Sequence, residues 1–590
     1  MNKSKWSALI VLGLIFAMLL SSCKTQATPT ATAETQAPTT EVLPTAPATS
    51  APVVAPPTEA ATSVPTQAPV SQEKPLIIAS GADVDTMFPD YSTTAFGSSL
   101  AALAYSSLTT VGLDAKVIPD LAETWEVSTD QLTWTFHLRK DAKWQDGQPI
   151  TAADVKFSYE FRADPAYLGG MYSNMTSIAG VAEKNAGTAT EISGIKVIDD
   201  NTISFTTVEP DALVLDTFAS SNMVVYPQHI LKDIPIADLG SSDYARLPIA
   251  SGPYQLTDWK PEESMTFTAN PYYYGTLPRI KTIIFKIVPE PSAQITGLLN
   301  GEVNILLGVS TDDLPSVTGV AGITVKELAD AQYLSLNLNL NDPLFKDVRT
   351  RQAMAYAIDR QALLDALYSG KGTLENSIFF PTLPEYNADI KGYDFDPAKA
   401  KQMLAEVGWS KTDSDGILEA ENVAGIADGT KFQFTLLSTT TPFYAQENQV
   451  IQQQLHQVGI KTDISQQEFS TYFSIVVAGG KWQATGIGWY NLIGTPQMEL
   501  GWNFMCPADR NTYGYCNPEL DTMINENNKL FDVQKRMDNF KAIQEIIHEA
   551  AVVIPMIRGS SIMAYQDTLV TPEFKTGIDA YRTMAAWYWK

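Results

Sequence analysis

The chain has 590 residues, and 40 basic against 66 acidic side chains give it a formal net charge of −26. This length, with 45% hydrophobic residues, is enough for several structural units with large cores. The acidic balance argues against nucleic acid as a partner, because phosphate binding depends on Lys and Arg. Three cysteines are too few for a disulfide framework, and no Cys or His spacing predicts a metal site.

The N-terminus has the pattern of an export signal. Two lysines precede an apolar run over 6–20, which is shorter than the roughly 20 residues of a membrane-spanning helix. The run ends in Leu-Ser-Ser-Cys at 20–23, which resembles the bacterial lipobox. We therefore predict a lipoprotein signal peptide over 1–22 and lipid attachment at Cys23, which would anchor the protein to the membrane. An ordinary secretory signal with an unrelated cysteine is the alternative.

Thr, Ala and Pro dominate residues 23–75, where large apolar side chains are scarce. Such a segment has too little apolar surface to offset the entropy of ordering, and its prolines favour extended backbone. We predict a disordered linker between the anchor and the folded body.

Strand and helix patterns interleave in the body that follows. Apolar and polar residues alternate over 132–138, which predicts a half-buried strand with His137 on its polar face. Thr151 with Asp154 three residues later forms a capping-box pattern that predicts the start of a helix.

Similar patterns recur further along the chain. Leucines alternate with Ser and Asn over 334–340, which predicts a strand whose polar face meets solvent or ligand. One helix is predicted from Asp347 to Tyr368, and another starts at Asp396 and Pro397 and ends at Gly408. Mixed strands and helices of this kind predict α/β lobes.

Several longer motifs follow one another in a recognisable order. They are V-I-P-D-L-A-E-T-W at 117–125, the run T-W-T-F-H-L-R-K-D-A-K-W-Q-D-G-Q-P-I-T-A-A-D-V-K-F-S at 133–158, S-G-P-Y at 251–254, A-N-P-Y-Y at 269–273, L-N-G-E-V-N-I at 299–305 and F-K-D-V-R-T-R-Q-A-M-A-Y-A-I-D-R at 345–360. Together they resemble the family 5 extracellular solute-binding proteins of ABC importers, which include oligopeptide, dipeptide and nickel binders. The resemblance covers nearly the whole body.

The resemblance implies an α/β fold of the two-lobed periplasmic-binding-protein type (class II). Lobe one is expected over 76–331, with an extra subdomain at about 115–245. Lobe two is expected over 332–551, and residues 552–590 return to lobe one. In this family a solute is captured between the lobes and passed to a membrane permease without chemical change.

The resemblance also places candidate ligand contacts. In peptide-binding relatives a Trp on the second lobe is followed three residues later by an Asp that pairs with the ligand's amino group. Trp489 matches the Trp, but Leu492 stands where the Asp is expected, so that charge pairing is not predicted here. The candidate ligand-binding residues are Trp489, Tyr490, Asn491 and Trp502 on lobe two and Asp85, Tyr105 and Ser106 on lobe one.

The sequence leaves the class of solute open. Family membership favours a short peptide. An oligosaccharide is the near alternative, because flat aromatic faces suit sugars and this region is rich in rings, although such rings also serve as core. The rings are Trp482, Trp489, Tyr490, Trp502, Tyr513 and Tyr515. Nickel chelates come third, because no His-rich patch is present.

Cys506 and Cys516 flank a loop with Pro, Asn and Gly. Export makes a disulfide between them feasible, and we predict one; two free thiols are the alternative.

Enzymatic alternatives have little support. The four histidines do not fall in a metal-binding spacing, the segment 370–373 lacks the first glycine of a phosphate loop, and no nucleophile-elbow motif is present. A cell-surface glycoside hydrolase is the rival hypothesis, and it would require a carboxylate pair facing a cleft. We predict a monomeric, non-enzymatic solute-binding lipoprotein without cofactor or metal, located outside the cytoplasmic membrane or in the periplasm. Its partners are a solute, an ABC permease and, through Cys23, the membrane.

Overall fold

The computed structural model describes residues 74–220, 222–330, 332–477, 481–490, 500–501, 503–506 and 511–590. These residues belong to one compact unit, Ser71–Lys590. The predicted signal peptide, Cys23 and the linker up to residue 73 lie outside them. Among the described residues, no helix is long and apolar enough to cross a membrane.

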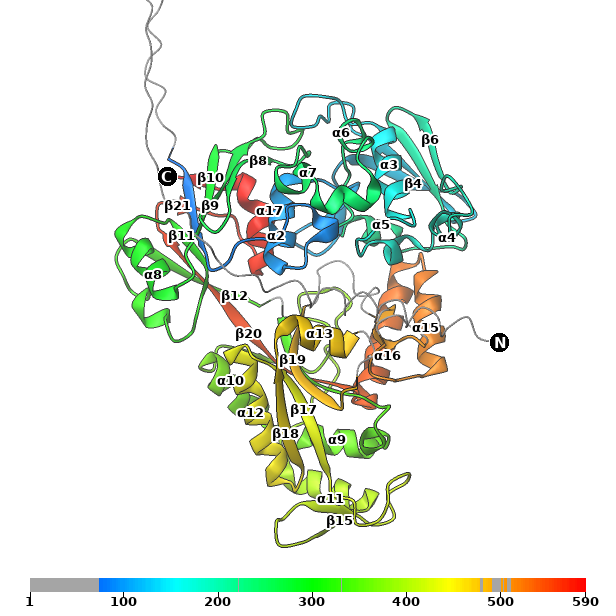
Figure 1. The fold of residues 1–590 in the computed structure, drawn as a ribbon, viewed down its shortest axis with the longest axis vertical. Helices are drawn as coiled ribbons and strands as arrows, with labels where there is room; N and C mark the ends of the chain where they lie inside the picture. The colour runs from blue at the N-terminus through cyan, green and yellow to red at the C-terminus, as the bar shows by residue number, and fades with distance from the viewer. Residues whose placement is uncertain are drawn as a thin grey trace, which may run out of the picture. The chain divides into compact units, whose positions relative to one another are not determined.

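A single twelve-stranded sheet runs through the described body (Figure 1). Its strands follow the order β18 (Lys461–Gln467), β17 (Gln433–Thr439), β19 (Ala484–Tyr490), β13 (Gln332–Leu338), β20 (Val553–Gln566), β11 (Ile305–Val309), β1 (Leu76–Ser80), β10 (Thr282–Ile287), β9 (Ser264–Ala269) and β8 (Tyr254–Lys260), and β12 (Ile323–Ala329) and β14 (Gly372–Leu374) also pair with β20. Strand β20 therefore stands between two groups of strands.

Strand β20 joins the two lobes. Its residues up to Gly559 pair with β13 and β14, and its residues from Ser560 onward pair with β12 and β11. A Cβ atom at Gly559 would lie 2.0 Å from the ring of Tyr368, so a side chain there would displace that ring. We refer to residues 76–330 and 560–590 as lobe one and to 332–559 as lobe two. The change of partners falls within the strand rather than at its start.

Lobe one is built on β1, which pairs in parallel with both β10 and β11. Helices α2 (Ala95–Ala104), α8 (Pro291–Asn300) and α17 (Gly577–Thr583) belong to this lobe. Its main core includes the fully buried Leu76, Phe88, Tyr226, Phe285 and Trp587. Alternating apolar residues of the strands supply much of this core, as their period of two requires.

The extra subdomain is a four-stranded antiparallel sheet with its own core. Its strands follow the order β4 (Ala122–Val127), β5 (Thr133–Leu138), β7 (Thr202–Thr206) and β6 (Ile195–Asp199), and its helices are α3 (Ala152–Arg162), α4 (Val181–Asn185) and α5 (Val214–Phe218). The predicted strand is confirmed as β5, with Trp134 and Phe136 buried and His137 exposed. The predicted capping box of Thr151 and Asp154 is present at the start of α3.

A buried ion pair fixes the extra subdomain to lobe one. The Arg162 guanidinium, on α3, donates to both carboxylate oxygens of Asp90 at 2.8 and 2.9 Å, and both side chains are fully buried. The hydroxyls of Tyr226 and Tyr167 donate to the same carboxylate at 2.6 and 2.8 Å. Because every group in this cluster is paired out of water, the joint resists separation. We call it the Asp90–Arg162 seam.

Lobe two carries most of the long helices. They are α9 (Val348–Tyr356), α10 (Arg360–Tyr368), α11 (Pro397–Val407), α12 (Pro442–Gln457), α13 (Phe469–Val477), α15 (Pro518–Asn528) and α16 (Val533–Ala550). The predicted single helix over 347–368 is wrong, because the chain leaves the helix after Tyr356 and Asp359 caps a new one by accepting the amide of Ala362 at 2.9 Å. The helix predicted from Asp396 to Gly408 is confirmed as α11.

The expectation for β13 is also corrected. Its polar side chains Ser335 and Asn337 are fully buried, and Asn339 is 7% exposed. Strand β13 pairs with β19 along one edge and with β20 along the other, and all seven of its residues are buried, so both of its faces are packed inside the protein. The Asn339 side-chain amide donates to the carbonyl of Trp482 at 2.9 Å. The predicted polar face therefore bonds the neighbouring segment of the lobe and does not meet solvent or ligand.

Short elements complete the described fold. They are β2 (Thr109–Val111), β3 (Val117–Pro119), α6 (Gln228–Leu231), α7 (Asp243–Arg246), β15 (Trp409–Thr412), β16 (Leu418–Ala420), β21 (Leu569–Val570) and β22 (Tyr588–Trp589), together with 3-10 turns at Pro89–Tyr91, Tyr172–Met175, Ile236–Ser241, Leu314–Ser316, Pro343–Phe345 and Met584–Ala586. Leu231, Leu239 and Tyr244 pack in the core of lobe one, although they fall within the stretch predicted for the extra subdomain.

Candidate ligand-binding site

The carboxyl ends of parallel strands mark a candidate binding edge on each lobe. In lobe two, β17 pairs in parallel with β18 and β19, just as β1 pairs with β10 and β11 in lobe one. Ligands of α/β sheets bind outside the carboxyl ends of their strands. These ends are Ser80, Ile287 and Val309 in lobe one and Thr439, Gln467 and Tyr490 in lobe two.

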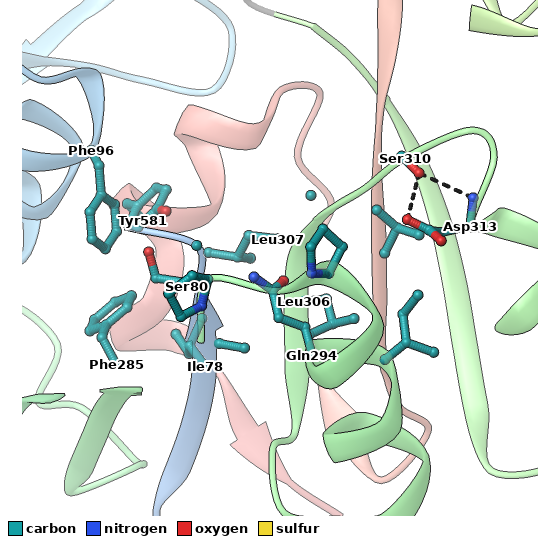
Figure 2. A pocket seen from close by; sticks show the side chains of 17 residues that line it. Ile78, Ser80, Phe96, Phe285, Gln294, Leu306, Leu307, Ser310, Asp313 and Tyr581 are labelled. Atoms are coloured by element: carbon teal, nitrogen blue, oxygen red, sulfur yellow. Dashed lines mark hydrogen bonds between the residues drawn. The ribbon is translucent and has the colours of Figure 1, made fainter. Parts of the chain in front are cut away.

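A cavity of about 460 Å³ opens at this edge of lobe one (Figure 2). This volume is in the usual range for small-molecule sites. Figure 2 shows the rings of Phe96, Phe285 and Tyr581 on one side and Gln294 and Leu306 on the other. The remaining described lining residues are Ile78, Ala79, Ser80, Gly81, Pro289, Pro291, Ile295, Leu307, Gly308, Val309, Ser310 and Asp313.

Polar side chains lie among the apolar ones in the lining of this cavity, and hydrogen bonds hold several of them in place. The Gln294 amide donates to the carbonyl of Val288 at 2.7 Å, which fixes its orientation. The Ser310 hydroxyl donates to the Asp313 carboxylate at 2.7 Å and accepts the Asp313 amide at 3.1 Å, which holds that carboxylate at the wall. Asp313 is the charged side chain among the described lining residues. A cavity with apolar rings and aliphatic side chains, hydrogen-bonding groups and one carboxylate suits a ligand that joins an apolar group to a cationic one.

Helix α13 presents a pair of aromatic rings at the corresponding edge of lobe two. It begins two residues after β18 ends, and Phe469 and Phe473 lie one turn apart on it. Their rings are nearly parallel with centroids 6.3 Å apart, and the two residues are 50% and 45% exposed. No sequence pattern described above predicts this pair. Its signal was two phenylalanines at i and i+4 directly after the end of a strand.

The ionised side chain of Glu468 fixes the start of α13. Its carboxylate accepts the amide of Ser470 at 2.8 Å and also bonds the Ser470 hydroxyl. The hydroxyl bond lowers the pKa of Glu468 more than its small desolvation raises it. Tyr472 points the other way, is 2% exposed and bonds Thr485 at 2.8 Å. The helix therefore has a buried face and an exposed aromatic face.

The predicted contacts on lobe two fall mostly at the limit of the described residues. Trp489 and Tyr490 are the last two residues of β19, opposite Tyr333 and Gln332 on β13, and the structure describes their backbone. This puts them at the carboxyl end of a parallel strand. Asn491, Leu492 and Trp502 lie outside the described residues. Ligand contact by these residues stays a prediction.

Three of the rings considered as a sugar platform are core residues. Trp482, Tyr513 and Tyr515 are 7%, 4% and 9% exposed and belong to a core cluster of lobe two. The rings of Trp482 and Tyr513 meet edge to face with centroids 6.3 Å apart. Their faces are used inside the lobe, which weakens the argument for an oligosaccharide.

The Asp85 carboxylate organises its own loop in lobe one. It accepts the hydroxyl of Ser92 at 2.9 Å and the amide and hydroxyl of Thr93 at 2.6 and 2.8 Å. Partial burial raises the pKa of Asp85, but these hydrogen bonds outweigh it, so the pKa lies below its usual value. The Thr86 amide and the Thr94 hydroxyl also donate to it, at 3.0 and 3.3 Å, so Asp85 is ionised and already bonded to five donors.

Tyr105 and Ser106 are also engaged within lobe one. Tyr105 is 4% exposed, and its hydroxyl donates to the carbonyl of Met87 at 2.8 Å. Ser106 is 5% exposed and accepts the hydroxyl of Tyr274 at 2.9 Å. The same hydroxyl bonds Asp120, whose pKa burial raises to about 6. Contact of these two side chains with a ligand stays a prediction.

The predicted disulfide is confirmed. Cys506 and Cys516 are bonded, with their Cα atoms 5.4 Å apart. The Cys506 amide donates to the Asp521 carboxylate on α15 at 3.2 Å, which ties the closed loop to that helix. Among the described residues, no group of three or more His, Cys, Asp and Glu side chains is placed to hold a metal ion.

The profile of the bacterial extracellular solute-binding proteins, family 5 (middle), matches residues 116–510. The chain belongs to this family. Its members are extracytoplasmic solute-binding proteins of ABC importers and not enzymes. The predicted resemblance and the non-enzymatic class are thereby confirmed.

Individual relatives agree with this assignment. The chain is 28% identical to the dipeptide-binding protein of Escherichia coli (strain K12) over 459 residues, which are 74% of this chain and 80% of that protein. It is 26% identical to the oligopeptide-binding protein AppA of Bacillus subtilis (strain 168) over 510 residues, 84% of this chain and 88% of AppA.

Solved structures of the same fold confirm the two-lobed α/β architecture. AppA from Bacillus subtilis in complex with a nonapeptide gives a TM-score of 0.73 at 24% identity, over 88% of this chain and 99% of AppA. NikZ from Campylobacter jejuni in complex with Ni(L-His) gives a TM-score of 0.72 at 22% identity, over 87% of this chain and 99% of NikZ.

Proposed function

We propose that this protein is a lipid-anchored substrate-binding protein that captures a short peptide between its lobes and delivers it to an ABC permease. The observation that supports the proposal most directly is the cavity with aromatic and aliphatic walls and the Asp313 carboxylate at the carboxyl ends of the lobe one strands. The names of the relatives, a dipeptide-binding and an oligopeptide-binding protein, agree with it.

A peptide fits the chemistry of this cavity. Its terminal ammonium group needs an anionic partner when it leaves water, because an unpaired buried charge is costly. Asp313 supplies a carboxylate, whereas the sequence has Leu492 at the position where peptide-binding relatives place one. The apolar walls and the rings of Phe469 and Phe473 offer surface for peptide side chains.

The remaining contacts come from the sequence-based prediction. Trp489, Tyr490 and Asn491, together with Trp502, complete the proposed wall on lobe two, and β19 brings the first two to the strand end. Asp85, Tyr105 and Ser106 are the proposed contacts on lobe one.

Closure of the lobes provides the mechanism. A solute that contacts both lobes favours the closed form by its differential affinity, and the chain can bend where β20 changes partners at Gly559 and Ser560. Shifting such an equilibrium from 1:99 to 99:1 requires about 5.5 kcal/mol. Hydrogen bonds and buried apolar surface between solute and lobes can supply this.

The lipid anchor rests on the sequence alone. Cys23 is the proposed acylation site, and residues 23–75 are the proposed linker to the folded body. Growth with radiolabelled palmitate should label the wild-type chain and not Cys23→Ala. Equal labelling of the two would contradict the anchor.

Mass spectrometry of solute released from the denatured, purified protein tests the ligand class. We expect short peptides, and recovery of oligosaccharides instead would overturn the proposal. Titration calorimetry with the recovered peptides then tests Asp313. We expect Asp313→Asn to lower affinity about tenfold or more for peptides with a free amino terminus, by loss of the ion pair.

Two controls isolate the charge at Asp313. The exposed neighbour Asp312 is outside the described lining of the cavity, so Asp312→Asn should bind like wild type. N-acetylated forms of the same peptides should bind wild type and Asp313→Asn equally. Equal loss for acetylated and free peptides would contradict pairing with the amino group.

A further inference from the structure

The loop between α15 and α16 in lobe two contacts the extra subdomain of lobe one. Phe531 in this loop stacks on Trp134 of β5, with ring centroids 5.8 Å apart and an interplanar angle of 20°. The phenyl ring packs against the hydrophobic core of the extra subdomain. In Figure 1 the orange α15–α16 pair lies next to α5.

Polar contacts accompany this stacking. The backbone amide of Ala212 donates to the carbonyl of Asn528 at 2.7 Å. The ammonium group of Lys529 lies 3.1 Å from a carboxylate oxygen of Glu209. The Trp134 indole donates to the carbonyl of Asp211 at 3.2 Å, which holds the subdomain side of the contact in place.

In a second contact, lobe one contributes the side chain and lobe two the core. Ala115, at the turn between β2 and β3, packs against the core cluster of lobe two that contains Trp482 and Tyr513. Each lobe thus places one apolar side chain against a core of the other, outside the strands that connect them.

The position of these contacts makes them sensitive to lobe rotation. Helix α16 has 18 residues and runs from this loop to the start of β20, so the loop lies roughly 27 Å from that end of the helix. The Asp90–Arg162 seam fixes the extra subdomain to lobe one. A rotation that opens the lobes about Gly559 and Ser560 therefore separates residues 528–531 from the subdomain.

We propose that residues 528–531 of lobe two, with Trp134 and residues 209–212 of the extra subdomain, form a clasp that holds the lobes closed and so sets the affinity for solute. This inference rests on the proposed function to the extent that closure traps the solute. One ring stack, one backbone hydrogen bond and one partly exposed ion pair make a contact that can open and re-form.

The clasp acts on affinity through the closed fraction. When only part of the population is competent to bind tightly, the apparent affinity falls by that fraction. A weaker clasp therefore lowers affinity without touching the solute, and its residues need not line the cavity.

Hydrogen exchange of the full chain without added solute tests the clasp directly. In Phe531→Ala we expect exchange over 209–216 to rise about tenfold, because loss of the ring stack releases the amide of Ala212. The control is Phe395→Ala, which removes a phenylalanine that is 44% exposed on the same lobe. It should leave exchange over 209–216 unchanged. If exchange over 209–216 is as slow in Phe531→Ala as in wild type, the clasp proposal is overturned.

A second variant keeps the test valid if Phe531→Ala disturbs folding. Lys529 is at the surface, so Lys529→Glu should fold like wild type and raise exchange over the same segment several-fold by placing like charges together. Unchanged exchange in both variants overturns the clasp.

Titration with a tryptic digest of casein separates the clasp from the proposed function. We expect Phe531→Ala to bind these peptides several-fold more weakly than Phe395→Ala. Exchange needs no ligand, so failure of all variants to bind peptides would contradict the proposed function and leave the exchange result in place. Equal peptide binding by both variants, with raised exchange, would overturn the effect of the clasp on affinity.

Discussion

The extra subdomain is joined to its two neighbours in different ways. Toward lobe one, the Asp90–Arg162 seam is fully buried and includes two tyrosine hydroxyls. Toward lobe two, the clasp consists of the Phe531 stack on Trp134 with polar contacts beside it, and its ion pair is partly exposed. The seam removes a complete ion pair from water, whereas the Lys529–Glu209 ion pair of the clasp stays partly hydrated.

This difference indicates which joint moves. Separating the seam would break a fully buried bidentate ion pair and expose the buried rings of Phe88, Phe161 and Tyr226 around it, which is strongly unfavourable. Separating the clasp lets water reach the freed amide, carbonyl and ammonium groups, so the cost is small. We expect the extra subdomain to travel with lobe one and to part from lobe two.

The largest expected effect comes from breaking the seam. Arg162→Met should lower the free energy of unfolding by about 3 to 5 kcal/mol, because it leaves the Asp90 carboxylate buried without its cation. Urea unfolding followed by circular dichroism measures this loss. The double variant Asp90→Leu with Arg162→Met removes both charges and should recover part of the loss. A loss below about 1 kcal/mol in Arg162→Met would contradict the role of the seam.

A smaller loss of stability inside lobe two separates stability from closure. Replacing both Cys506 and Cys516 by Ser should lower the free energy of unfolding by about 2 to 3 kcal/mol, since the disulfide no longer restricts the unfolded chain. Exchange over 209–216 should stay as in wild type, because the clasp contacts are intact. Raised exchange there would show that lower stability alone opens the clasp.

The next effect is a dependence of the clasp on pH. Asp216 lies on α5 of the subdomain, near Arg536 and Glu385 of lobe two and Asp211 of its own loop. Burial raises the pKa of Asp216 to about 7, with Arg536 opposing and Glu385 adding to the shift. Burial also raises the pKa of Glu385.

Proton linkage determines whether the clasp becomes stronger or weaker as the pH rises. A carboxyl whose pKa is raised in the closed form stabilises that form fully below its ordinary pKa of 3.8 and loses this contribution as the pH rises through about 7. Exchange over 209–216, corrected for its intrinsic pH dependence, should be slower at pH 5 than at pH 8. Asp216→Asn should reduce this difference. If Asp216→Asn shows the same difference in exchange between pH 5 and pH 8 as wild type, other titrating groups cause the pH dependence.

The smallest expected effect is that of the surface ion pair. Glu209→Lys and Lys529→Glu should each weaken the clasp by less than about 1 kcal/mol, and the double variant should restore it. The single-variant effects should shrink in 1 M salt, which screens exposed charges. Exchange over 209–216 at low and high salt measures this. Failure of the double variant to recover would mean that the pair contributes nothing.

Local patterns in the sequence were sufficient for several elements. The alternation around Trp134 predicts β5, the pair Thr151 and Asp154 predicts the start of α3, and Asp396 with Pro397 predicts α11. In each case the residues that determine the structure are close in sequence. The disulfide was predictable for the same reason, because its cysteines flank one short loop.

Tertiary context decided the features that the sequence did not reveal. The polar side chains of β13 are buried because this strand is central in the sheet and both of its faces are packed inside the protein, and the break at Asp359 depends on a cap within an otherwise helical pattern. The cavity and the clasp bring together segments from opposite ends of the chain, as Phe531 and Trp134 show. No local periodicity reports such contacts.

Small-angle X-ray scattering tests the central claim, that two lobes close on a peptide, most directly. The full chain, stripped of bound solute, is measured alone and with a tryptic digest of casein. We predict a smaller radius of gyration with the peptides than without them. The peptides recovered from the protein should have unchanged masses, because binding does not alter them chemically. An unchanged radius with peptides, or a decrease produced by maltooligosaccharides alone, would contradict the account.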